Sequence, residues 1–147
     1  MTNFFDSLET DSTDARTARQ LAQLQDQVAL AQAKAPYFAE SLKGVDADSL
    51  TSLEALAALP VVRKSDLMDH QQSNPPFGGM TATPSADLAR LYMSPGPILD
   101  PDGHAPNFDW WRFGRAAWAA GLRKGDRVAN CFSYHLTPAG RMFEEAA

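Results

Sequence analysis

The most constraining feature of this sequence is a long opening stretch without glycine or proline. All nine glycines and all ten prolines lie after residue 35. Within residues 13–35, four apolar side chains recur at three- and four-residue spacing: Leu21, Leu24, Val28 and Ala31. The spacing predicts a helix that starts at Ser12 or Thr13 and ends at Pro36. Its stripe favours packing against a core. A dimerising coiled coil is the alternative, but it needs more heptads than this stretch holds.

Shorter elements follow as far as residue 72. The segment "YFAESLKG" predicts a short helix closed by Gly44. Ser49 and Ser52 precede an apolar run that Pro60 stops, and Lys64 begins a further helical turn. We therefore expect residues 1–72 to form a mainly helical section.

Turn-forming residues then dominate residues 73–87. They are Pro75, Pro76, Gly78, Gly79 and Pro84. Their density predicts a loop. Phe77 and Met80 make this segment too apolar for a free tether, so we expect the loop to pack against its neighbours.

Strand and helix patterns alternate in residues 88–147. Residues 88–94 read as a strand, followed by a loop to about Asn107. The segment "FDWWRFGRAAWAAGL" predicts a helix that starts at Asn107 or Asp109 and ends near Gly121. Residues 127–132 predict a second strand. Strand, helix and strand make one βαβ-like unit, which indicates an α/β fold with a helical N-terminal section.

A last helix opens near Thr137 and Pro138 and is still running at residue 147. Two paired strands do not form a stable layer without neighbours. We therefore expect this chain to be part of a longer protein, a partial domain of an apparently truncated α/β fold.

Composition excludes several classes of function. Thirteen basic and eighteen acidic side chains give a net charge of −5, so no broad cationic surface is available for nucleic acid. The single cysteine, Cys131, cannot form an internal disulfide, so nothing requires an oxidising compartment. Neither a signal peptide nor a run of eighteen apolar residues is found, so no membrane span is predicted. We expect a cytoplasmic protein.

Three blocks of the sequence carry a resemblance to a known family. They are "APYFAESLKGVDADSLTSLEALAALPVVRKSDL", "LARLYMSPG" and "AAWAAGLRKGDRVANCFSYHLTPAG". In order and spacing they resemble the N-terminal part of the phenylacetate-coenzyme A ligase family, within the acyl-adenylate-forming superfamily. The "AAGLRKGDRV" block alone is moderately specific, and its order and spacing relative to the other two blocks make the match stronger than any one motif. The resemblance spans most of the chain.

The resemblance implies a reaction in two steps. A small carboxylic acid attacks the α-phosphate of ATP to give an acyl-adenylate and pyrophosphate, and the thiol of coenzyme A then displaces AMP to give a thioester. It implies ATP, Mg²⁺ and coenzyme A for the full-length protein, with Mg²⁺ screening the phosphates. The family's later nucleotide motifs, its hinge and its C-terminal lysine would lie beyond residue 147. A homodimer formed through that missing portion is left open.

The family's phosphate-binding loop would fall on residues 94–103, "SPGPILDPDG", with Ser94, Gly96 and Gly103 as candidates. Such loops work because backbone N–H groups and hydroxyls converge on one anion. Pro95 and Pro97 each remove an N–H, and Asp100 and Asp102 add negative charge. Three interpretations remain: a degenerate phosphate loop, a divergent loop that still works, and a plain surface turn.

The segment "FSYHLTPAG" matches the family's stretch beside the acid-binding pocket, so the resemblance makes Tyr134, His135 and Gly140 acid-pocket candidates. The phenylacetate enzymes have glycine where this chain has His135. At the end of a strand, His135 is a candidate pocket residue. A polar residue that satisfies the start of a helix is the alternative.

Other reactive side chains predict no catalytic or metal site. His70, His104 and His135 lack the spacing of a zinc site. Cys131 lies in an apolar run without a basic neighbour, which favours a buried inert thiol over a nucleophile. Adjacent carboxylates on a helix do not face each other, so Glu144 and Glu145 are not predicted to act as a pair.

The aromatic cluster around the second predicted helix favours core packing over a ligand platform. Its members are Phe108, Trp110, Trp111, Phe113 and Trp118. Because Trp110 and Trp111 point to different sides of a helix, we expect one of them to be exposed.

These observations favour the N-terminal fragment of a carboxylate-coenzyme A ligase that is inactive as an isolated chain. The resemblance favours aromatic carboxylic acids as substrates. The alternative is a non-catalytic binding or interaction module that retains part of the fold and a degenerate phosphate loop. A helical dimerisation segment at residues 13–35 is a third interpretation.

Overall fold

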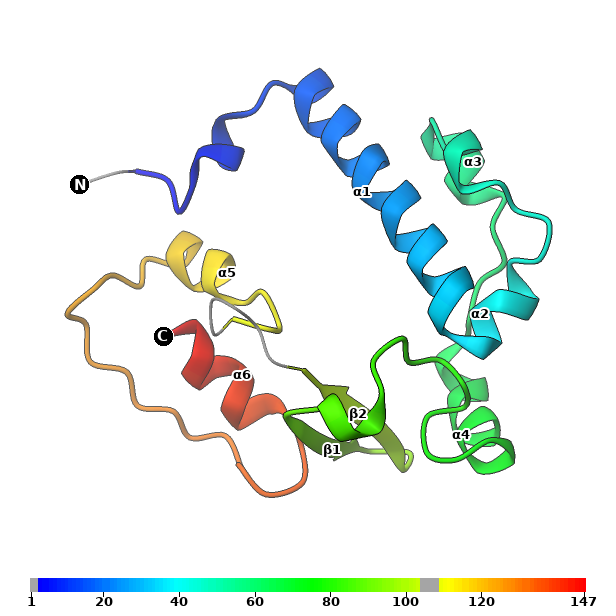
Figure 1. Ribbon diagram of the computed structural model, residues 1–147. Helices are drawn as coiled ribbons and strands as arrows, with labels where there is room; N and C mark the ends of the chain where they lie inside the picture. Colours follow the sequence, from blue (N-terminus) through cyan, green and yellow to red (C-terminus); the bar gives the residue numbers. More distant parts are fainter. Residues whose placement is uncertain (1–2, 104–108) are drawn as a thin grey trace. The chain divides into compact units, whose positions relative to one another are not determined.

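The computed structural model describes residues 3–103 and 109–147 (Figure 1). The described chain divides into two compact units. One is Asp11–Pro84, and the other joins the residues up to Thr10 to Ser85–Ala147. The second unit is therefore discontinuous in sequence.

Helices build the unit Asp11–Pro84. They are α1 (Thr13–Lys34), α2 (Pro36–Ser41), the 3-10 turn η2 (Ala47–Ser49), α3 (Leu53–Ala57) and α4 (Lys64–Ser73) (Figure 1). The Ser12 side chain caps α1 by accepting the N–H of Ala15 at 3.2 Å. Pro36, the first residue of α2, follows α1 after one residue. The predicted long helix and both of its ends are confirmed.

The core of this unit lies between α1 and the segments that follow it. Val28, Leu42 and Leu50 form the buried cluster. The Gln32 amide, on α1, donates to the carbonyls of Leu42 at 3.0 Å and of Val45 at 2.9 Å. These bonds satisfy carbonyls next to a helix end that would otherwise lack partners. The stripe of α1 thus packs in a core, as predicted.

The loop after α4 also packs on its own unit. Phe77 is buried, and the backbone N–H of Tyr37 donates to the Gly79 carbonyl at 3.0 Å. Gly79 has a φ of 70°, which favours glycine. The prediction that this loop packs against its neighbours is confirmed.

The discontinuous unit contains the only strands among the described residues, β1 (Arg90–Ser94) and β2 (Ile98–Asp102). They pair antiparallel, with Arg90 opposite Asp102 and Ser94 opposite Ile98. The unit also holds the 3-10 turns η1 (Ser7–Thr10) and η3 (Ser85–Asp87), with α5 (Gly114–Ala119) and α6 (Ala139–Ala146). Strands combined with helices after a helical section agree with the predicted α/β class.

The predicted loop from residue 94 to Asn107 is wrong over its first half, because residues 98–102 form β2. Ile98 and Asp102, both buried, lie on one face of the hairpin, where packing stabilises a strand despite Pro101. Proline has no N–H to donate to a neighbouring strand, and it is tolerated in β2 because β2 is an edge strand. Asn107 lies outside the described residues.

The predicted helix over residues 108–122 is only six residues long, Gly114–Ala119. Arg112 has a φ of 57°, which helical backbone does not allow. Asp109 instead closes a turn, accepting the N–H groups of Phe113 at 2.8 Å and Gly114 at 2.9 Å. The end near Gly121, with a φ of 104°, agrees with the prediction. Phe108 lies outside the described residues.

The predicted second strand is also wrong. Residues 127–132 pair with no strand in the described chain. The Asn130 side-chain oxygen accepts a hydrogen bond from the backbone N–H of Phe132 at 3.1 Å. Such a local bond competes with the hydrogen bonds of a strand pair. The sheet is therefore an antiparallel hairpin, and the βαβ-like crossover is absent from the described residues. The final helix, α6, begins close to its predicted position.

Candidate functional site

The hairpin separates the three phosphate-loop candidates. Ser94 ends β1 and Gly96 lies in the tight turn at the tip, whereas Gly103 follows Asp102 at the other end. The pair at the tip, Ser94 and Ile98, lies four residues along the strands from the pair at the base, Arg90 and Asp102, which is roughly 13 Å at the rise of a β-strand. Ser94 and Gly96 are thus brought together, and Gly103 is not.

The hairpin tip offers few hydrogen-bond donors. Pro95, Gly96 and Pro97 are exposed, and only the glycine has an N–H. The Ser94 hydroxyl lies 3.5 Å from the Ile98 carbonyl, at the limit of a hydrogen bond. A Cβ at Gly96 would lie 2.8 Å from Cγ1 of Ile98, so the turn requires glycine there. One backbone N–H and one hydroxyl can therefore point outward at the tip.

One backbone hydrogen bond joins the segment of the acid-pocket candidates to β1. The N–H of Met93 donates to the carbonyl of Leu136 at 2.7 Å. Leu136 directly follows His135, so this bond ties the end of the segment with Tyr134 and His135 to β1. Both side chains are exposed. The structure thus brings the acid-pocket segment beside Met93, one residue before Ser94.

Asn130 and Gly140 hold this segment against the start of α6. The Asn130 Nδ2 donates to the Tyr134 hydroxyl at 3.0 Å and to the Gly140 carbonyl at 2.7 Å. The Gly140 N–H donates to the Ser133 carbonyl at 3.2 Å. A Cβ at Gly140 would lie 2.5 Å from the same oxygen, so only glycine fits. Sequence reasoning selected Gly140 and Tyr134 but missed Asn130, whose signal was an amide inside the run "VANCF".

A chain of charges joins the base of the hairpin to α6. Arg90 Nη1 lies 2.8 Å from Oδ2 of Asp102 and 3.2 Å from Oε1 of Glu145. Arg141 contacts the same Glu145 oxygen at 2.9 Å and Glu144 at 2.8 Å. The hydrogen bond with Asp102 raises the pKa of the Arg90 guanidinium, and the bond with Glu144 raises that of Arg141.

This ionic chain corrects the predicted role of Asp102. Asp102 is fully buried and paired with Arg90, so it does not present negative charge to a ligand at the tip. Its Oδ1 and the Oε2 of Glu145 are buried without a hydrogen-bond partner. Burial also raises the pKa of the neighbouring Tyr92. Sequence reasoning missed the network because its members are far apart in the chain.

The aromatic side chains divide as expected. Trp110 is exposed to 41%, while Trp111 and Trp118 are half-buried. Arg123 stacks on the Trp118 ring with its guanidinium carbon 3.8 Å from the ring centroid. Phe132 and Phe143 stack at 4.7 Å between centroids. These contacts support the interpretation as packing.

Cys131 is exposed, so the expected burial of its thiol is wrong. Burial failed because residues 127–132 do not enter a sheet. No group of three metal-ligating side chains forms in the described residues. His104 lies outside them. No helix in the described chain is long and apolar enough to cross a bilayer.

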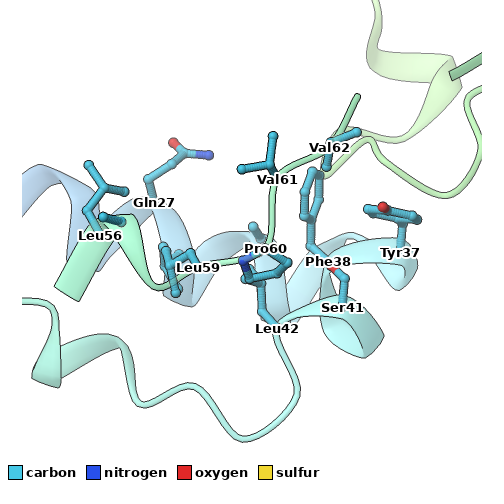
Figure 2. Close-up of a pocket in the computed structure, with 13 residues that line it drawn as sticks. Gln27, Tyr37, Phe38, Ser41, Leu42, Leu56, Leu59, Pro60, Val61 and Val62 are labelled. Carbon is cyan, nitrogen blue, oxygen red and sulfur yellow. The ribbon is translucent and has the colours of Figure 1, made fainter. Parts of the chain in front are cut away.

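The unit Asp11–Pro84 contains a separate open pocket with a volume of about 490 Å³ (Figure 2). Phe38 reaches it from α2, Leu42 from the residue that follows α2, and Leu59 and Pro60 from the segment after α3 (Figure 2). The lining is mostly apolar, with Gln27, Tyr37 and Ser41 as polar members. None of the predicted site residues lines this pocket.

Comparison with known proteins gives consistent relatives. The chain is 35% identical over 142 residues to a phenylacetate-coenzyme A ligase of Pseudomonas putida, covering 92% of this chain and 31% of that protein. Enzymes of the same name from Aromatoleum evansii and Thermus thermophilus are 35% and 33% identical over 90% of this chain. The chain thus spans about a third of the length of these relatives. No protein-family model matches it.

Solved structures of a 2-hydroxyisobutyryl-CoA ligase share the fold. An open conformation in complex with 2-HIB-AMP and CoA gives a TM-score of 0.81 at 28% identity, over 99% of this chain and 36% of that chain. A postadenylation state in complex with 2-HIB-AMP gives a TM-score of 0.80 at 26% identity, over 91% and 30%.

Proposed function

The chain is a relative of the phenylacetate-coenzyme A ligases, and on that premise we propose that it forms the N-terminal part of an ATP-dependent ligase. The ligase joins a small carboxylic acid to coenzyme A. The observation that carries the proposal is the 35% identity over 92% of this chain to a phenylacetate-coenzyme A ligase. Ligands named in the related structures, an acyl-AMP and CoA, fit both steps of the proposed reaction.

The described residues divide the first step between two elements. The Ser94 hydroxyl and the Gly96 N–H at the hairpin tip face the phosphates of ATP, and Tyr134 faces the acid. The Met93–Leu136 hydrogen bond supports this division, because it fixes the acid-side segment beside the hairpin. Fixed geometry lowers the barrier of the chemical step, because the entropy of bringing the two reactants together is lost on binding.

In this proposal residues 1–147 do not complete the reaction alone. They span about a third of the length of the relatives. The tip supplies one N–H and one hydroxyl, whereas stabilising charge on a transferring phosphoryl group takes several convergent donors or cations. ATP brings Mg²⁺ with its phosphates, and the remaining positive groups come from the rest of the full-length protein.

The proposal also extends to surroundings and partners. The enzyme works in the cytoplasm, where ATP and coenzyme A are available, with a small carboxylic acid as its substrate. A homodimer forms, if at all, through residues beyond this chain.

Acid-dependent exchange of pyrophosphate into ATP by the full-length protein tests the ligase. We expect exchange with at least one member of a panel of aryl and short hydroxy acids, followed by thioester formation when coenzyme A is added. Residues 1–147 alone serve as the control and should give none. The proposal would be overturned if the full-length protein catalysed no exchange with any acid of the panel and did not bind ATP in calorimetry.

One observation favours a second function, a non-catalytic binding module. The hairpin tip has prolines on both sides of Gly96, so two of its three residues have no N–H. A full-length protein that binds a carboxylic acid in calorimetry, but neither binds ATP nor catalyses exchange, would support this module over the ligase.

A further inference from the structure

We propose that Asn130 is a positioning residue, which holds the Tyr134 phenol so that its hydroxyl hydrogen points outward to the acid substrate. The inference rests on the proposed function, because Tyr134 is an acid-pocket residue only in a carboxylate ligase. Asn130 itself has no direct contact with the substrate in this proposal.

The Asn130 side chain uses all of its hydrogen-bonding groups locally. Its two amide hydrogens serve the Tyr134 oxygen at 3.0 Å and the Gly140 carbonyl at 2.7 Å. Its carbonyl oxygen accepts the N–H of Phe132 at 3.1 Å. A flipped amide would place oxygen against the Gly140 carbonyl oxygen, so the hydrogen-bond network assigns this orientation.

The anchor on which Asn130 holds Tyr134 cannot shift. The Gly140 Cα approaches the Ser133 backbone so closely that a Cβ would lie 2.5 Å from its carbonyl oxygen. On the other side of Tyr134, the Leu136 carbonyl is bonded to Met93 of β1 at 2.7 Å. Tyr134 therefore sits between two fixed backbone points, and the amide fixes its remaining freedom.

The direction of this hydrogen bond decides what Tyr134 can recognise. An amide nitrogen only donates, so the phenol oxygen must accept from Asn130. The phenol's own hydrogen is then free for another acceptor, and the side chain is 52% exposed. Tyr134 is thus set to donate to an oxygen of the substrate, the chemistry of a carboxylate or acyl oxygen.

Steady-state exchange by the full-length protein tests this role. Asn130→Ala should raise the KM for the acid about tenfold and leave the KM for ATP unchanged, since one oriented hydrogen bond to a charged oxygen is lost. Asn3→Ala, which removes an exposed asparagine elsewhere, should leave both constants unchanged. An equal rise in the KM for the acid and the KM for ATP would overturn the proposal and indicate a purely structural role.

Two further variants separate positioning from structure. In a Tyr134→Phe background, Asn130→Ala should have almost no further effect on the KM for the acid, because it acts through the lost hydroxyl. Asn130→Asp keeps the shape of the side chain but turns the Tyr134 hydrogen inward, onto the carboxylate. It should raise the KM for the acid at least as much as Asn130→Ala. The inference would be contradicted if the two substitutions raised the KM for the acid independently, so that their effects multiplied in the double variant. It would also be contradicted if Asn130→Asp kept the wild-type KM for the acid.

A spectroscopic measurement keeps the inference separate from the ligase proposal. In full-length protein labelled with 3-fluorotyrosine, the resonance absent from the Tyr134→Phe spectrum belongs to Tyr134, and Asn130→Ala should shift it. An unshifted resonance would overturn the positioning role whether or not the protein is a ligase. A shifted resonance in a protein without exchange activity would sustain the contact and overturn only the function.

Discussion

At the scale of single residues, Arg90 holds two carboxylates in place. It bonds Asp102, which is fully buried, and Glu145, whose side chain is 7% exposed. A carboxylate removed from water is stable as an anion only beside a positive charge. Arg90 therefore joins the hairpin base to α6 by neutralising charge that burial would otherwise make costly.

Replacing Arg90 by alanine should lower the free energy of unfolding by about 3 kcal/mol, because both carboxylates then lose a charged partner. Lys43→Ala is the matched control. Its bond to Glu40 is 3.8 Å long, with both side chains at least 75% exposed, so its loss should change the stability by less than about 0.5 kcal/mol. Urea unfolding of the three proteins measures both values. Equal stabilities of the wild type and Arg90→Ala would show that these ion pairs do not stabilise the fold.

At the scale of elements, local signals predicted the helices better than the strands. Ser12 and Pro36 bound α1 because a capping side chain and a missing N–H act within a few residues. The helix at residues 108–122 failed for an equally local reason, the turn that Asp109 closes before Gly114. An aspartate can cap a helix or close a turn before it, and the sequence pattern does not distinguish the two.

Asp109→Ala should cost about 1 kcal/mol of unfolding free energy, the usual value of a lost cap, because the N–H groups of Phe113 and Gly114 lose their shared acceptor. Asp109→Asn keeps one acceptor oxygen and should cost less. Thermal unfolding followed by circular dichroism gives the order. If the asparagine variant were as unstable as the alanine variant, the charge rather than the bond would stabilise the turn.

At the scale of the whole molecule, the N-terminal residues up to Thr10 share one unit with Ser85–Ala147, although residues 11–84 intervene. Phe5 packs edge-on against Trp118 with 6.2 Å between ring centroids. Asp6 and Glu9 both pair with Arg115 on α5. Contacts of this kind close a long loop, so they depend on the folded unit and have no signature in local sequence.

The pairing with Arg115 should make this contact sensitive to acid. The hydrogen bond from Arg115 lowers the pKa of the Asp6 carboxyl below its usual 3.8. A lowered folded-state pKa stabilises the fold above pH 3.8, and this contribution is lost as the pH falls through the folded-state value. Asp6→Asn should therefore be less stable than the wild type at pH 6, and the difference should shrink as the pH falls below 3.8 and through the lowered folded-state pKa.

Chemical unfolding at a series of pH values between 2 and 7 measures that difference. Glu54→Gln is a useful control, because the pKa of the Glu54 carboxyl is lowered by hydrogen bonds within the start of its own helix. A constant gap between Asp6→Asn and wild type across the whole range would exclude the charged pair as its cause.

The sequence by itself determined the elements whose causes are local, and its motif order predicted which proteins it resembles. Three local signals act over a few residues: capping serines, prolines and an apolar period of three to four residues. They were enough to predict α1, α2, α3 and the loop after α4. Motif order was enough for the relationship to coenzyme A ligases.

Only the tertiary structure decided the hairpin partner of β1, the burial of Asp102 and the contact of Asn130 with Tyr134. The hairpin forms because Ile98 and Asp102 are buried on one face, Asp102 shares Arg90 with Glu145 of α6, and the Asn130 amide is held by the Gly140 carbonyl. The sequence does not show whether an aspartate is exposed to solvent or buried beside an arginine. Its meaning for a phosphate site is set by what packs around it.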